Sequence, residues 1–173
     1  MYAAAGGMGN ALIDVAKAAD LTVIGVVSSD EKARFARDLG ADHVINRKTG
    51  KITERVREIT QNRGVDTIID PVAGPSIPDN IALLAPCGML VLYGGLGGRV
   101  QLDLQQTLRL SKNSPAVRQF TIHTWDHLVE ERRSGMRPSS KCLQPASCIR
   151  GSMLVCRLRR QDERMRCSRA ARC

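Results

Sequence analysis

Residues 3–9 read Ala-Ala-Ala-Gly-Gly-Met-Gly and run directly into an apolar-periodic segment from Asn10 to Asp20. Aligned on the pattern G-x-G-x-x-G, the three small positions are Ala4, Gly6 and Gly9. Small residues let the backbone approach a pyrophosphate, and the start of the following helix supplies unpaired N–H groups and positive dipole charge. The stretch therefore predicts the phosphate-binding turn of a dinucleotide-binding unit. A structural turn of the same composition that binds no nucleotide is the alternative.

Strands and helices are predicted to alternate from this glycine turn to about residue 125. Leu21–Val27 is a continuous apolar run, as expected of a parallel strand buried on both faces. Further strands are predicted at His43–Asn46, Val65–Asp70, Met89–Tyr93 and Val117–Thr124. Helices are predicted in the intervals, after Ser28, near 52–59, at 77–85 and at 101–110, and again from His127. The alternation with short loops predicts an α/β fold with a doubly wound parallel sheet.

Three local features carry their own expectations. Ser28 is expected to cap the next helix, since Glu31 follows it at the spacing of a capping box. Cys87 is expected to be a small packed residue in the Pro-Cys-Gly turn that ends the 77–85 helix. Asp70 is expected to fix the turn that it forms with Pro71 at the end of a strand.

The strand before the glycine turn should lie at the centre of the sheet, in the strand order 3-2-1-4-5-6. Only Met1 and Tyr2 precede Ala3 in this chain. We therefore expect a sheet truncated at its first strand, with the neighbouring strands facing one another unpaired and a marginally stable domain.

Charge and cysteine content divide the chain into two parts. Residues 1–136 hold 16 Lys and Arg and 15 Asp and Glu, whereas residues 137–173 hold 10 and 2. Five of the six cysteines also lie in the second part, which has no sustained helical or strand period. We expect one partial domain over 1–136, followed by a tail that is disordered or translated from a shifted reading frame. The cysteines of the tail contain no C-x-x-C pair, which argues against a zinc site.

No apolar run approaches the roughly 20 residues that cross a bilayer, and no basic segment precedes an apolar core at the start. The expected location is the cytoplasm, without membrane attachment. His123 and His127 have the i, i+4 spacing of zinc ligands on a helix, but no third ligand is evident, so no metal site is predicted.

The glycine turn opens the first of three blocks of sequence that follow one another along the chain. Residues 3–46, then 52–74 (ITERVREITQNRGVDTIIDPVAG), then 83–95 (LLAPCGMLVLYGG), closely resemble the cofactor domain of the zinc-independent quinone oxidoreductases in the medium-chain dehydrogenase/reductase superfamily. The resemblance covers about residues 3–133. It implies a Rossmann-type domain that binds NADPH and belongs to an enzyme transferring hydride to a quinone or an activated carbonyl or alkene.

The resemblance also implies roles for ten residues. Gly6, Gly7, Met8 and Gly9 would hold the pyrophosphate through their N–H groups. Ser28 and Lys32 would lie at the 2′-phosphate, together with Arg47, where the family commonly has Tyr. A guanidinium binds phosphate bidentately, so Arg47 suits the same ligand. Val72 and the loop at Tyr93 and Gly94 match positions that line the adenine and nicotinamide sides.

NADPH is favoured over NADH because no acidic residue stands at Val27, Ser28 or Ser29. An NAD enzyme places a carboxylate there to accept bonds from the ribose hydroxyls. Asp30 comes slightly late, and a carboxylate in the first turn of a helix is also favoured by the dipole.

Two departures from the family limit the expected activity. Family members carry a second, mostly β domain that forms the other wall of the substrate cleft, and this chain has none of it. They also complete a C-terminal helix after the region of Arg133, where this chain enters its Arg- and Cys-rich tail. No general acid or base is evident in this chain. We therefore expect the isolated chain to be weakly active or inactive. The alternative is a non-catalytic interaction module that docks on a related subunit, with the last strand building a homo- or hetero-dimer. Nucleic-acid binding by the tail is disfavoured because the tail has no aromatic residue for stacking.

Overall fold

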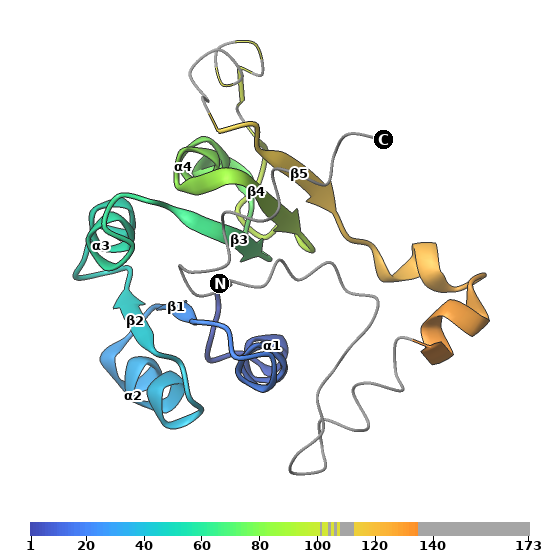
Figure 1. The fold of residues 1–173 in the computed structure, drawn as a ribbon, viewed down its shortest axis with the longest axis horizontal. Helices are drawn as coiled ribbons and strands as arrows, with labels where there is room; N and C mark the ends of the chain where they lie inside the picture. The colour runs from blue at the N-terminus through green and yellow to red at the C-terminus, as the bar shows by residue number, and fades with distance from the viewer. Residues whose placement is uncertain (101, 104, 106, 108–112, 135–173) are drawn as a thin grey trace, which may run out of the picture.

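The computed structural model describes residues 1–100, 102–103, 105, 107 and 113–134. Helices and strands alternate from α1 to β4, as predicted (Figure 1). The helices are α1 (Gly7–Ala18), α2 (Asp30–Asp38), α3 (Ile52–Ile59) and α4 (Ile77–Ala82), with short 3₁₀ helices η1 (Gly74–Ser76) and η2 (Ile122–Trp125). The strands are β1 (Ile24–Val27), β2 (His43–Asn46), β3 (Val65–Asp70), β4 (Leu84–Leu92) and β5 (Ala116–Gln119). The tail predicted at 137–173 and most of the helix predicted at 101–110 lie outside the described residues.

The strand pairs in these residues are all parallel. β1 pairs with β2, and β4 lies between β3 and β5. Tyr2 lies between the two ladders, since it bridges Val26 of β1 while its N–H donates to the Ile69 carbonyl of β3 at 3.0 Å. The lateral order is therefore β2, β1, Tyr2, β3, β4, β5. This is the predicted order of a Rossmann-type sheet, with its first strand reduced to a stub.

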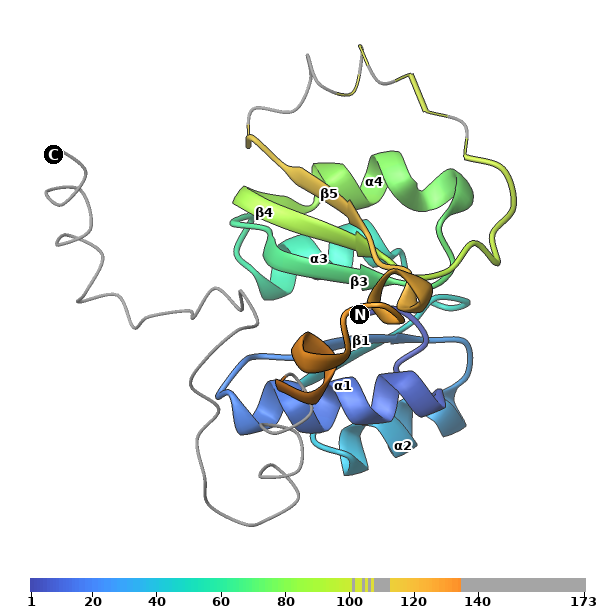
Figure 2. The ribbon, with the colours of Figure 1, turned by 90° about the vertical axis from the view of Figure 1, so that its right-hand side faces the viewer.

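Met1 and Tyr2 form more hydrogen bonds to the backbones of the neighbouring strands than the sequence suggested. The Val26 N–H donates to the Met1 carbonyl at 2.8 Å, and the Met1 nitrogen donates to the Ile24 carbonyl at 2.6 Å. Both views place the N-terminus between β1 and β3 (Figures 1 and 2). The expectation of unpaired neighbours is therefore wrong at the end nearest the glycine turn. Two residues are too few for a ladder but enough to bond to both sides.

Helices cover both faces of the sheet. On one face, a buried apolar cluster joins Ile13 of α1 and Ala36 of α2 to the strands. On the other face, Val56 of α3 and Ile81 of α4 belong to a second cluster around the buried Leu90 of β4. Figure 2 shows α1 and α2 together beside β1, away from α4. The doubly wound arrangement predicted from the alternation is confirmed.

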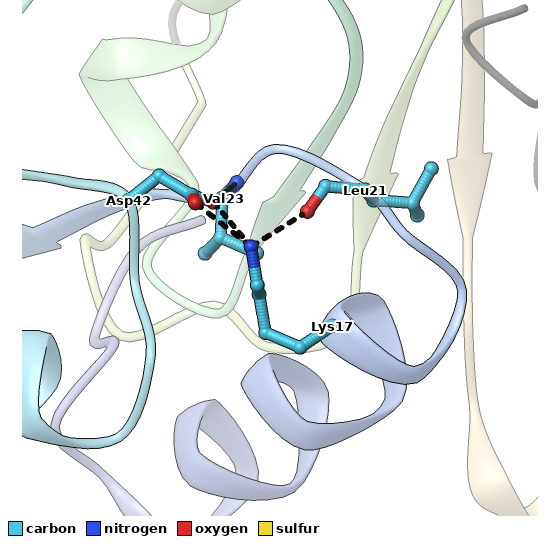
Figure 3. A network of polar contacts seen from close by, with 4 residues as sticks. All are labelled: Lys17, Leu21, Val23 and Asp42. Carbon is cyan, nitrogen blue, oxygen red and sulfur yellow. Dashed lines mark hydrogen bonds and ion pairs between the residues drawn. The ribbon is translucent and has the colours of Figure 1, made fainter. Parts of the chain in front are cut away.

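An ion pair fixes the end of α1 to the starts of β1 and β2 (Figure 3). The Lys17 ammonium lies 2.8 Å from the Asp42 carboxylate and 3.4 Å from the Leu21 carbonyl. The same carboxylate accepts the Val23 N–H at 2.7 Å. Partial burial alone would raise the pKa of Asp42, but the hydrogen bonds from Lys17 and Val23 outweigh it and hold that pKa below its usual value.

The segment after α4 differs from the prediction. The helix ends at Ala82 instead of residue 85, and β4 already begins at Leu84, so Pro86-Cys87-Gly88 lies within the strand. The pairing register of β3 and β4 shifts there, and Cys87 has a φ of 60°. Cys87 is exposed, so the expectation of a packed side chain was wrong. The irregularity turns this side chain outward while its N–H donates to the Asn113 carbonyl at 2.7 Å.

Three boundaries of strands and helices also differ from the prediction. The first apolar run becomes a strand only from Ile24, and the cap of α2 is Ser29, whose hydroxyl accepts the Lys32 N–H at 3.3 Å. Ser28 does not cap, although it has the same chemistry, because the helix begins one residue later. The last predicted strand ends at Gln119 and is followed by η2, which contains His123.

Candidate functional site

The glycine turn connects Tyr2 to α1 and exposes the start of that helix. Gly6 occupies the N-cap position without any side-chain hydrogen bond, and no acidic residue lies in the first turn. The first N–H groups of a helix have no partner within it. A Cβ atom at Gly9 would lie 2.4 Å from the Ala3 carbonyl oxygen, whereas one at Gly7 would meet nothing within 4 Å. Gly9 is therefore required by packing, and Gly7 leaves open space in front of the exposed amides.

Met8 and Asn10 border the same turn. The Met8 side chain is 55% exposed, so it covers no core. Asn10, one residue beyond Gly9, has the only buried side-chain oxygen without a hydrogen-bond partner among the described residues. The Asn10 oxygen is an acceptor and does not itself favour an anion. The backbone N–H groups at the start of α1 are the unpaired donors, and with no acidic residue in the first turn they fit an anionic ligand.

The three residues predicted for the 2′-phosphate lie at the ends of β1 and β2. Ser28 directly follows β1, and the backbone N–H of Arg47 donates to the Val27 carbonyl at 2.9 Å, so the two strand ends are joined. Lys32 lies in the first turn of α2. Lys32 and Arg47 are both exposed, and neither forms an ion pair with any described residue. The cations are therefore available to an anion.

A buried polar network shapes the loop after β3. Asp70 and Asn80 are both 0% exposed. One Asp70 oxygen accepts the N–H groups of Val72 and Ala73 at 2.7 and 3.1 Å, and the other accepts the Asn80 amide at 3.0 Å. The Asn80 oxygen in turn accepts the Tyr2 hydroxyl at 2.6 Å. The expected role of Asp70 in fixing this turn is confirmed.

The loops after β3 and β4 pack backbone against backbone. The Gly97 N–H donates to the Val72 carbonyl at 2.6 Å, and a Cβ atom at Gly94 would lie 2.3 Å from the Pro71 carbonyl oxygen. Ala73 has a φ of 54°, a strained value for a residue with a side chain. Burial, followed by the charge of Asp70, raises the pKa of Tyr93, which begins the second loop. Val72, Tyr93 and Gly94 are thus brought together.

All these positions meet at one edge of the sheet. The glycine turn follows Tyr2, and the other predicted residues follow β1, β2, β3 and β4. Ligands of doubly wound parallel sheets bind at the carboxyl ends of the strands, where the strand order reverses. The structure therefore places the predicted residues at one edge of the sheet, after the carboxyl ends of its strands. Sequence reasoning missed Asn80, because an Asn within a short helix carries no pattern that links it to Tyr2.

The histidines lie elsewhere. His123 is exposed in η2 and lies 3.1 Å from the Asp126 carboxylate. Within residues 1–100, 102–103, 105, 107 and 113–134, no group of three or more His, Cys, Asp or Glu could hold a metal ion. In the same residues, no helix is both long and apolar enough to span a bilayer.

Known proteins resemble the chain in both sequence and structure. The family model of zinc-binding dehydrogenases matches residues 7–132. A 2-haloacrylate reductase from Burkholderia sp. is 38% identical over 148 residues, which are 83% of this chain and 42% of that protein. A quinone oxidoreductase from Pseudomonas aeruginosa is 37% identical over 99 residues, covering 57% of this chain and 30% of that one.

Solved structures give the same result. The crystal structure of 2-haloacrylate reductase matches with a TM-score of 0.73 at 32% identity, over 81% of this chain and 44% of that one. The Escherichia coli quinone oxidoreductase complexed with NADPH matches with a TM-score of 0.70 at 26% identity, over 85% and 46%. The chain thus spans less than half the length of these relatives.

The fold, the sequence identities and the part of each relative that is matched therefore agree with the resemblance described under Sequence analysis. The chain belongs to the family of zinc-binding dehydrogenases, within the medium-chain dehydrogenase/reductase superfamily, and corresponds to the cofactor domain of its quinone oxidoreductase relatives.

Proposed function

We propose that this chain is the NADP(H)-binding part of a quinone-oxidoreductase-like enzyme. The observation that carries the proposal is the uncapped start of α1 with exposed Gly6 and Gly7, at the same end of the sheet as two exposed cations, Lys32 and Arg47, that pair with no described residue. Support comes from a relative of the same fold whose structure is a complex with NADPH. The residues present fit a phosphorylated dinucleotide in donor chemistry, in charge and in the space before Gly7.

Each predicted residue has a separate task in this proposal. The N–H groups of Gly7, Met8 and Gly9 bind the pyrophosphate, and Gly6 keeps the backbone open to it. Lys32 and Arg47, with the Ser28 hydroxyl, bind the 2′-phosphate by charge and hydrogen bonding.

The remaining contacts come from the two interlocked loops. Val72, Tyr93 and Gly94 line the adenine and nicotinamide sides and fix the orientation of the ligand. When bound, NADPH supplies a hydride for a quinone or an activated carbonyl or alkene.

The catalytic contribution of this chain is positional. The proposal assigns no residue of this chain as general acid or base, because hydride transfer depends on orientation and on a shielded cleft. The matched relatives are more than twice as long as the region they share with this chain. We propose that the second cleft wall lies outside this chain, that the isolated chain has little or no reductase activity, and that it uses no zinc.

A fluorescence titration of the 173-residue chain with NADPH tests the cofactor claim. Binding at micromolar to submillimolar concentration, with a change in nicotinamide fluorescence, is the expected result. No binding at millimolar NADPH rejects the claim for this chain.

A second candidate function is a docking module, and β5 is the observation that favours it. β5 is the outer strand of its ladder and is exposed along its length. Val117, Phe120 and Ile122 add exposed apolar side chains in and beyond it. Pairing of β5 with a related subunit covers both the strand edge and these side chains. Only monomer in sedimentation equilibrium, with or without a full-length relative, counts against this function.

A further inference from the structure

Asp30 and Asn46 join α2 to the end of β2. Asp30 is the first residue of α2 and Asn46 the last of β2, and the Asn46 Nδ2 donates to the Asp30 Oδ1 at 2.8 Å. The Asn46 Oδ1 accepts the Lys48 N–H at 3.1 Å, so both ends of the amide are engaged. The Asn46 carbonyl also accepts the N–H groups of Thr49 and Gly50 at 3.2 and 3.0 Å. Asn46 therefore holds the turn that carries Arg47.

We infer that this Asp30–Asn46 clasp is a determinant of selectivity for the phosphorylated dinucleotide over the unphosphorylated one; the inference rests on the proposed function. Asp30 is the first carboxylate after β1. A free carboxylate near the end of this strand accepts bonds from ribose hydroxyls and repels a 2′-phosphate. The clasp engages one oxygen of this carboxylate, Oδ1, with the Asn46 amide and so fixes the orientation of the charge.

The groove that Asp30 lines supports a location of its carboxylate apart from the residues proposed for the 2′-phosphate. Asp30 and Asn46 line one groove between α2 and β2, together with Arg34 and Arg37. The residues proposed for the 2′-phosphate, Ser28, Lys32 and Arg47, are not part of that lining. Asp30 thus belongs to a groove whose other lining residues include Arg34 and Arg37 but none of the residues proposed for the 2′-phosphate.

The clasp also positions the cation. The Arg47 N–H donates to the Val27 carbonyl at the end of β1, and the turn that follows is closed onto Asn46. Lys32 lies two residues after Asp30 on α2. One hydrogen bond between Asp30 and Asn46 therefore ties together the two backbone segments that carry the cations. Asn46 and Asp30 act as positioning residues, without contacting the ligand themselves.

Two substitutions separate the hydrogen bond from the charge. Asn46→Ala breaks the clasp and leaves the Asp30 carboxylate free. Asp30→Asn removes the charge and keeps an acceptor for the Asn46 amide. Asp38→Asn, at the other end of α2, is the matched control for loss of one negative charge, since Asp38 is exposed and forms no ion pair with any described residue.

Titrations of the full chain with NADPH and with NADH measure the ratio of their affinities. Asn46→Ala is expected to lower NADPH affinity about fivefold, the effect of one hydrogen bond, while NADH affinity stays the same or rises. Asp30→Asn and Asp38→Asn are expected to keep the preference for NADPH. Adding Asp30→Asn to Asn46→Ala is expected to restore part of the lost NADPH affinity.

The outcomes are distinguishable. If Asn46→Ala weakens both nucleotides equally, or changes neither, while the wild-type chain prefers NADPH, the clasp inference is overturned and the proposed function stands. If the wild-type chain binds neither nucleotide, the proposed function fails and the inference with it. Thermal unfolding of each variant verifies that it folds. The double variant Asn46→Ala/Asp30→Asn adds a test by gain of NADPH affinity, which misfolding does not produce.

Discussion

The Tyr2 hydroxyl donates a hydrogen bond to the Asn80 Oδ1 at 2.6 Å, which ties the residue before the glycine turn to the helix after the β3 loop. The Asn80 amide donates in turn to Asp70, so two groups with no exposed surface lie between Tyr2 and the loop. Side-chain hydrogen bonds therefore connect the residue at the position of the first strand to the loop after β3.

Replacing Tyr2 by Phe is expected to lower the free energy of unfolding by about 1–3 kcal/mol, because a buried Asn80 acceptor loses its donor. Urea denaturation at neutral pH measures the change. An unchanged midpoint contradicts the importance of this bond. Phe120→Leu, at an exposed site beyond β5, serves as an aromatic control and is expected to have little effect.

Tyr2 also predicts that the stability of the protein depends on pH in the alkaline range. Burial, then the charge of Asp70, raises the pKa of Tyr2 from 10.0 to about 12. The unfolded chain therefore loses this proton first, and the stabilisation is complete below pH 10 and lost as pH rises through about 12. Between these values the wild-type chain is expected to lose about 1–2 kcal/mol more stability than Tyr2→Phe. Parallel stability curves of the two proteins over this range contradict the assignment.

Substitution of Asp70 tests the loop after β3. Asp70→Ala leaves the Val72 and Ala73 N–H groups without their acceptor and is expected to cost about 3 kcal/mol or more. Asp70→Asn keeps an acceptor oxygen for these groups and is expected to cost less. Denaturant unfolding of both variants gives the comparison, and equal costs contradict a hydrogen-bonding role.

Two glycines of the phosphate turn are expected to respond differently to Ala. Gly9→Ala places a Cβ against the Ala3 carbonyl oxygen and is expected to cost about 1–3 kcal/mol of stability. Gly7→Ala adds a Cβ in open space, so stability should stay within about 1 kcal/mol of wild type. That Cβ stands in front of the proposed pyrophosphate, and NADPH affinity should fall by about tenfold, or 1.4 kcal/mol. Full NADPH binding by a folded Gly7→Ala protein contradicts the proposed pose.

The Lys17–Asp42 pair predicts that the free energy of unfolding decreases slightly at acidic pH (Figure 3). Asp42→Asn keeps an acceptor for the Val23 N–H but loses the charge, so it is expected to cost about 0.5–1 kcal/mol at pH 7, a value reduced by solvent screening. The lowered pKa of Asp42 means that this stabilisation is present above the unfolded value near 4 and disappears as pH falls through the folded value. Urea denaturation at pH 7 and pH 3 measures it. A difference between the proteins that does not decrease from pH 7 to pH 3 contradicts the electrostatic explanation.

Much of the fold follows from the sequence, because hydrophobic period and glycine placement report directly on strands, helices and the phosphate turn. The parallel order and the position of the glycine turn were predicted in this way. The start of β4 was not, because Pro86 and Gly88 have the composition of a turn yet lie in a strand whose register shifts. The choice of Ser29 over Ser28 as a cap depends on where the strand ends, which two adjacent serines do not reveal.

Parts of the candidate site depend on tertiary contacts and were not predictable. The Tyr2–Asn80 and Asp30–Asn46 bonds join residues 78 and 16 positions apart, and no local pattern links them. The bridging role of Met1 and Tyr2 was missed for a related reason. A strand is recognised from a run of residues, whereas a bridge needs only one residue on each side.

Isothermal titration of NADPH and NADH into the wild-type chain and into a Lys32→Ala/Arg47→Ala variant tests the central claim most directly. Wild type is expected to bind NADPH at least about tenfold more tightly than NADH, and the variant to bind the two about equally, since two charge-assisted phosphate contacts are lost. Equal affinities in the wild-type chain, or a preference for NADPH that survives both substitutions, contradict the account.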